Sequence, residues 1–101
     1  MPKKTRSYRA WQLEKLASPA AAASYLDACL AESPELFLTA LKKVAQANQM
    51  AKVARNAGVQ RETLYRSLSE QGNPTLETLA SVLGVLGMSL AIRPKASHHK
   101  K

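Results

Sequence analysis

Histidine, cysteine and aromatic side chains are scarce in this sequence of 101 residues. The two histidines, His98 and His99, are adjacent at the charged carboxyl end, and Cys29 is the single cysteine. One cysteine cannot form an internal disulfide, and the sequence has no Cys/His spacing typical of a metal site. A nucleophile with a nearby base and a glycine-rich phosphate loop are also missing. We therefore expect no enzymatic activity, no bound metal and no cofactor.

Long apolar runs are missing as well. The sequence contains no stretch of 18 or more apolar residues, which a membrane-spanning helix needs. Its amino end lacks the basic start followed by an apolar segment that marks a cleavable signal. These absences predict a cytoplasmic protein with no membrane partner. Cys29 falls on the apolar side of a predicted helix, and we interpret it as a buried free thiol.

Basic residues, by contrast, are abundant and unevenly spread. Fifteen Lys and Arg against seven Asp and Glu give a formal net charge of +8, which favours a polyanionic partner such as nucleic acid. Residues 1–17 and 40–71 each carry a net +4, whereas residues 18–39 carry −3. Two faces of opposite sign suggest two different partners. For the terminal runs, the alternative is that the charges belong to solvated tails.

The length and the 46% apolar content predict one domain with a single compact core. The helical patterns along the chain predict an all-α fold, with about five helices around that core. We expect a flexible basic arm over residues 1–7, the domain over 8–93 and a disordered basic tail over 94–101. A short helix is expected over 8–16, where Trp11 either anchors the helix or contacts another protein.

Three longer helices are expected from apolar spacing and start signals. Ser18-Pro19 and Ser33-Pro34 each combine a capping serine with a first-turn proline, and they predict helices over 19–31 and 34–48. Thr75 is expected to cap a third helix, which ends at Gly87. Gly84 lies inside this helix at a cost of roughly 1 kcal/mol relative to alanine, and we interpret it as a close approach between helices.

The segment over residues 50–68, MAKVARNAGVQRETLYRSL, is typical of a DNA-binding helix-turn-helix. Ala54 allows two helices to cross closely, and Gly58 can take the left-handed conformation that ends the first of them. Spacings of three and four residues place the apolar side chains on two facing stripes. The predicted helix-turn-helix core consists of Val53, Ala54, Gly58, Leu64 and Leu68.

In a helix-turn-helix, the second helix lies in the major groove and the first helix spans the backbone. The second helix is expected over residues 60–68, with Leu64 and Leu68 facing inward. The predicted base contacts are Gln60, Arg61, Glu62 and Arg66. The predicted phosphate contacts are Gln49, Lys52, Arg55, Thr63 and Tyr65. The alternative is an ordinary solvated face, and Tyr65 has a second alternative as a partly buried packing residue.

The end of the domain has the period of a short β-strand, because Met88, Leu90 and Ile92 alternate with Ser89 and Ala91. A strand without a partner in its own chain is unstable. We therefore predict that this strand pairs with its copy in a homodimer. A dimer, formed through this strand or alternatively by packing of the last helix, would also supply the two recognition helices that a palindromic double-stranded DNA operator requires.

Four segments within residues 18–90 resemble a known family. They are SYLDACLAE, VAQANQMAKVARNAGV, LYRSLSEQGNPTLETL and LGVLGMSL. The sequence is similar to the small antidote proteins of the HigA-like addiction-module type, within the Cro/CI-type helix-turn-helix superfamily. The resemblance implies an all-helical antitoxin that represses its own operon and neutralises a small RelE-like toxin. It maps the family's recognition helix onto residues 60–68. The basic amino end, RSYRAWQLEKL, differs from the family's commoner acidic opening.

A basic toxin that handles RNA would find an acidic docking surface at Asp27, Glu32 and Glu35. Ordinary solvated carboxylates are the alternative for these three residues. Two other functions are also compatible with the sequence. One is a stand-alone Cro/CI-type regulator without a toxin partner, and the other is a helical adaptor that binds only proteins.

Overall fold

The computed structural model describes residues 18–69 and 71–95, and over these residues the chain folds into five α-helices. They are α2 (Pro19–Glu32), α3 (Pro34–Ala47), α4 (Met50–Ala57), α5 (Arg61–Ser67) and α6 (Leu76–Val85). The all-helical fold expected from the sequence is confirmed for this part of the chain. The expected arm over 1–7, the helix over 8–16 and most of the expected tail lie outside the described residues.

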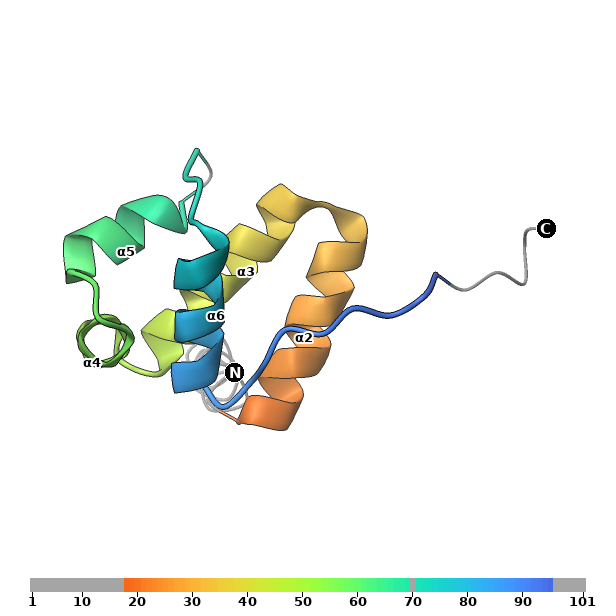
Figure 1. The fold of residues 1–101 in the computed structure, drawn as a ribbon, viewed down its shortest axis with the longest axis horizontal. Helices are drawn as coiled ribbons and strands as arrows, with labels where there is room; N and C mark the ends of the chain where they lie inside the picture. The colour runs from red at the N-terminus through yellow and green to blue at the C-terminus, as the bar shows by residue number, and fades with distance from the viewer. Residues whose placement is uncertain (1–17, 70, 96–101) are drawn as a thin grey trace, which may run out of the picture.

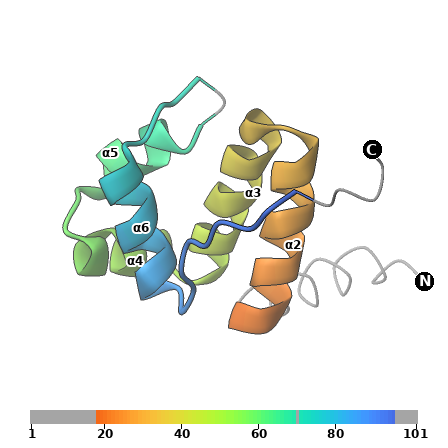
Figure 2. The ribbon, with the colours of Figure 1, turned by 45° about the vertical axis from the view of Figure 1, so that its right-hand side comes forward.

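The helices form two groups. Helices α2 and α3 run antiparallel side by side, while α4 and α5 lie at the opposite end of the molecule and α6 lies between the two groups (Figures 1 and 2). The most extensive packing joins α2 to α3, and α4 contacts α3, α5 and α6. Helix α4 therefore connects the short helix α5 to the rest of the fold.

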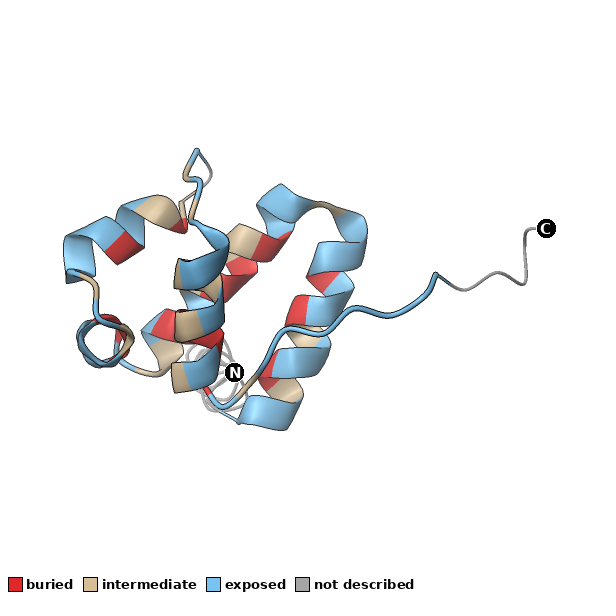
Figure 3. Ribbon diagram, in the orientation of Figure 1, coloured by how far each residue is buried: buried red, intermediate tan, exposed pale blue. Residues whose placement is uncertain are grey.

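One apolar cluster holds these helices together, and its residues occupy the facing sides of the helices (Figure 3). The largest completely buried side chains are Leu41, Val44, Val53, Leu64, Leu68 and Val82. Among the described residues, no polar or charged residue is buried. Burial of apolar area, at roughly 25 cal/mol per Å², is thus the dominant stabilising contribution to this core.

The two Ser-Pro pairs begin their helices differently. The Ser33 hydroxyl accepts a hydrogen bond from the Leu36 N–H at 3.1 Å, as expected of a capping serine. Ser18 occupies the N-cap position of α2 as predicted, but its side chain makes no cap bond, and Pro19 follows in the first turn. Thr75 caps α6 as expected, because its hydroxyl accepts from the Thr78 N–H at 3.0 Å.

This difference predicts unequal effects of two matched substitutions. Ser33→Ala should lower the free energy of unfolding by about 1 kcal/mol, because the Leu36 N–H loses its acceptor. Ser18→Ala should change it by no more than about 0.3 kcal/mol, because Ser18 makes no cap bond. Urea denaturation of both variants measures the difference. Equal losses would contradict the assignment of α3 capping to Ser33.

Helix α6 ends at Val85, and the expected terminator Gly87 follows two residues later. The Gly87 backbone is left-handed, with φ of 86°, and the Met88 N–H donates to the Leu83 carbonyl at 2.7 Å. The interpretation of Gly84 as a close helix approach is wrong, because a Cβ atom built there meets no other atom within 4 Å. Gly84 is exposed, and its helix loses stability without gaining packing.

Gly84→Ala is therefore expected to raise the free energy of unfolding by about 0.5–1 kcal/mol, because alanine is the better helix former and fits the open space. Gly87→Ala is the matched control and should destabilise the protein. Its Cβ atom would combine a positive φ with a 3.1 Å approach to Cγ of Pro19. The midpoint of thermal unfolding should rise for Gly84→Ala and fall for Gly87→Ala. Destabilisation by both substitutions would contradict this expectation.

The segment after α6 crosses the outer side of α2 (Figures 1 and 2). Residues 88–95 form neither helix nor strand, and no strand occurs elsewhere in the described chain. A single chain offers no second strand for pairing, so the pairing of Met88, Leu90 and Ile92 in a dimer stays a prediction. Within this chain, Nη2 of Arg93 lies 3.1 Å from Oδ1 of Asp27. Leu90 and Ile92 are exposed, and Met88 is partly buried.

Candidate nucleic-acid interface

The turn between α4 and α5 is formed by three residues. Helix α4 ends at Gly58, whose φ of 79° and ψ of 25° are left-handed, and the Val59 N–H donates to the Ala54 carbonyl at 2.9 Å. Gln60 is then extended, and α5 begins at Arg61. Glycine is suited to this conformation because it has no Cβ atom to clash. The observed α5 is one residue shorter at each end than the expected helix over 60–68.

Helix α5 turns its apolar side inward and its polar side outward. Leu64 is completely buried, and Leu68 at the end of the helix is buried as well. The four predicted base-contact residues, Gln60, Arg61, Glu62 and Arg66, are all exposed. Gln60 makes no side-chain cap bond, so its amide is not used to begin the helix. The arginines and Glu62 line one shallow depression together with Tyr65 and Ser69.

The predicted phosphate-contact residues are also exposed. Lys52 and Arg55 lie on α4, while Thr63 and Tyr65 lie on α5. Gln49 precedes α4 with a φ of 68°, a positive value that is uncommon for a residue with a side chain. Such backbone strain costs of order 1–3 kcal/mol and is often found at binding sites.

Lys42 of α3 also lies at this surface, and the sequence pattern did not predict its contacts there. Nζ of Lys42 lies 4.5 Å from the centroid of the Tyr65 ring and 3.5 Å from Oγ of Ser69. The Ser69 hydroxyl donates to the Tyr65 carbonyl at 2.8 Å. No local spacing in the sequence signals this contact, because the residues lie on separate helices that tertiary packing brings together.

Three acidic residues lie on the first two helices, α2 and α3. Asp27 and Glu32 on α2 and Glu35 on α3 are exposed, and two half-exposed leucines, Leu30 and Leu36, lie among them in the sequence. Helix α2 lies away from α5, whereas α3 reaches α5 through Lys42 (Figure 1). Acidic and basic residues are therefore only partly separated among the described residues, because α3 also carries Lys42 and Lys43 and α5 carries Glu62.

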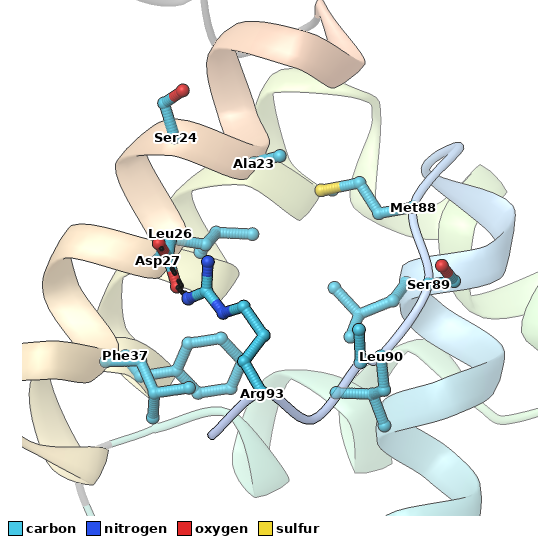
Figure 4. A pocket seen from close by; sticks show the side chains of 12 residues that line it. Ala23, Ser24, Leu26, Asp27, Phe37, Met88, Ser89, Leu90 and Arg93 are labelled. Carbon is cyan, nitrogen blue, oxygen red and sulfur yellow. Dashed lines mark hydrogen bonds and ion pairs between the residues drawn. The ribbon is translucent and has the colours of Figure 1, made fainter. Parts of the chain in front are cut away.

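A groove of about 380 Å³ runs between α2 and the segment after α6. Figure 4 shows Leu26 and Phe37 on one side, Leu90 and Met88 on the other, and the guanidinium of Arg93 turned toward Asp27. This ion pair is largely exposed, so water and salt screen it and it stabilises the segment by at most a fraction of a kcal/mol.

Cys29 is buried, as predicted for a structural thiol. Its neighbour Tyr25 has a pKa raised above the ordinary value of 10.0, chiefly because burial disfavours the phenolate, with smaller contributions from the charge of Cys29 and a hydrogen bond to it. The phenol therefore stays neutral at physiological pH. No group of three metal-ligating residues occurs within 18–69 or 71–95.

Comparison with known proteins gives the family. A family model described as "probable addiction module antidote protein" matches residues 9–94. The chain belongs to this antidote family. A protein of Haemophilus influenzae, described as uncharacterized, is 41% identical over 70 residues, which cover 68% of this chain and 72% of the relative. No solved structure matches the chain.

Membership supports the role of antitoxin in a toxin-antitoxin module, and it implies a toxin as partner. The antidote family is not an enzyme family. None of the described helices of this antidote protein is long and apolar enough to cross a membrane.

Proposed function

We propose that this antidote protein is a cytoplasmic, DNA-binding repressor of its own operon and the antitoxin of a RelE-like toxin. The main support for DNA binding is the left-handed turn at Gly58, which is followed directly by the exposed helix α5. Two helices joined in this way can place the second in a major groove, as in Cro/CI-type helix-turn-helix proteins. The arginines of α5 are then available for bidentate contacts with guanine.

The surrounding charges favour the same orientation. Lys52 and Arg55 are exposed on α4, the helix that spans the DNA backbone in this arrangement. Gln49 adds an exposed amide at the start of that helix. These side chains supply the phosphate contacts that hold a recognition helix in register, while the α5 residues read bases.

Two copies are needed for a palindromic operator. We propose that the antidote protein is a homodimer in which Met88, Leu90 and Ile92 pair with the same residues of a second copy. The support is that Ile92 is 99% exposed and that the segment carrying it forms no strand within one chain. Edge pairing would use its free backbone groups and cover its apolar side chains.

The DNA-binding proposal is tested by titrating the full chain into a fragment that spans the promoter of its own gene, at fixed salt and with excess nonspecific competitor. We expect a retarded complex whose footprint is two-fold symmetric. Binding no tighter than to a scrambled fragment of equal length would overturn the proposal in favour of an adaptor that binds only proteins.

The toxin is proposed to dock on the acidic residues Asp27, Glu32 and Glu35. An RNA-degrading toxin is expected to be basic, and electrostatic complementarity favours association with this face. Because the acidic residues lie away from α5, toxin and DNA would bind different parts of the molecule. This arrangement lets one protein neutralise the toxin and repress the operon at the same time.

Co-purification of a tagged antidote protein with the product of the adjacent gene tests this docking. Charge reversal by Glu32→Lys and Glu35→Lys together should reduce retention of that product at least tenfold. Glu77→Lys on α6, also at an exposed residue, is the matched control and should retain it. Failure of the wild-type protein to retain any product would favour the stand-alone regulator.

A further inference from the structure

The contact between Lys42 and Tyr65 links α3 to α5 outside the apolar core. A cation within about 6 Å of an aromatic ring is attracted to its face, and Nζ of Lys42 lies 4.5 Å from the Tyr65 centroid. The same ammonium group reaches Oγ of Ser69 at 3.5 Å. Ser69 in turn donates to the Tyr65 carbonyl. Lys42 therefore contacts α5 at Tyr65 and the segment after α5 at Ser69.

Helix α5 needs such a link because its own packing is limited. It has seven residues, of which Leu64 is the buried one. Leu64 and, directly after the helix, Leu68 hold α5 from its inner side, so no buried side chain on its outer side resists small rotations about the helix axis. Tyr65 is adjacent to Arg66 and lies one helical turn after Arg61, so any rotation that moves the ring also moves both arginines.

We propose that Lys42 is a positioning residue that fixes the rotation of α5 and thereby the direction of Arg61 and Arg66. This inference rests on the proposed reading of DNA by α5. It differs from a phosphate-contact role for Lys42, because the ammonium group is directed to Tyr65 and Ser69 within the protein. The neighbouring Lys43 is exposed and offers the comparison of an equal charge on the same helix.

The variant Lys42→Met keeps most of the apolar stem and removes the charge. We expect it to weaken binding to the promoter fragment by about two- to fivefold, the effect of losing one exposed cation–π contact. The slope of log affinity against log salt should stay unchanged, since no phosphate contact is lost. Base preference at the operator positions read by α5 should broaden. Lys42→Arg should restore both properties, because guanidinium also binds aromatic faces.

A double-mutant cycle identifies the partner. Lys42→Met should cause no further loss in a Tyr65→Leu background, because the ring is already absent. Lys43→Met is the matched control and should change affinity by less than about twofold with base preference intact. Thermal unfolding of each variant separates loss of folded protein from loss of positioning.

Three results would overturn the inference. A salt slope reduced by about one unit, with additive losses in the cycle, would make Lys42 a phosphate contact. Equal behaviour of Lys42→Met and Lys43→Met would leave Lys42 without a special role. If the wild-type protein does not bind the promoter fragment, the proposed DNA-binding function fails first, and the positioning role fails with it.

Discussion

Replacing Arg61 and Arg66 together by alanine is expected to weaken operator binding by about 2–6 kcal/mol, or roughly thirtyfold to more than ten-thousandfold. Each bidentate contact between arginine and guanine contributes about 1–3 kcal/mol to discrimination between bases. Both side chains are exposed on α5, so their removal leaves the core unchanged. The measurement is a titration of the promoter fragment at fixed salt, accompanied by the single variants.

Lys52→Ala is the comparison that separates base reading from general electrostatic attraction. It removes one positive charge from α4 and should weaken binding to specific and scrambled DNA about equally, with the salt slope lowered by about one unit. The double arginine variant should instead lose the difference between the two DNAs. Unchanged specificity in that variant would rule out α5 as the reading element.

Leu64→Ala is expected to lower the free energy of unfolding by about 2–5 kcal/mol. The Leu64 side chain is completely buried, and its truncation removes apolar contacts and leaves a cavity that a small core fills only in part. Domains of this size are commonly stable by only about 5–15 kcal/mol, so this loss is a large fraction of the total. Helix α5 should separate from α4 first, because Leu64 is its buried residue.

Leu76→Ala gives the matched control for this substitution. Leu76 is 71% exposed at the start of α6, so the same chemical change should alter stability by less than about 0.5 kcal/mol. Urea denaturation measures both variants. Hydrogen exchange of the α5 amides in Leu64→Ala should also be faster than that of the α2 amides. Similar losses for the two leucines would show that α5 is not held by Leu64.

Local patterns predicted the helices well because the signals are strong and short-range. Helix ends are fixed through the backbone of immediate neighbours at Ser33, Thr75, Gly58 and Gly87. The structure has those ends within two residues of the expected positions. The same reasoning wrongly predicted a cap bond from the Ser18 side chain and a close approach between helices at Gly84. A capping residue type does not ensure a cap bond, and a glycine in a helix does not require a close neighbour.

The candidate interface was predictable only where one segment supplies it. The residues of α4 and α5 follow from periodicity, since inward Leu64 and Leu68 determine which side chains face outward. Lys42 could not be found in this way, because its contact with Tyr65 depends on how α3 and α5 meet in three dimensions. The positive φ of Gln49 could not be predicted either, because nothing about glutamine as a residue type indicates it.

The formal charge differs between the described helices, with −2 on α2, +1 on α3, +2 on α4 and +1 on α5. If α5 binds DNA as proposed, the field of the duplex would favour orientations in which α4 and α5 approach first and α2 trails. Association should therefore be faster than for a protein of equal net charge spread evenly, and this advantage should decline as the Debye length shortens. In such a complex α2 would face outward, where a basic protein in solution could reach it.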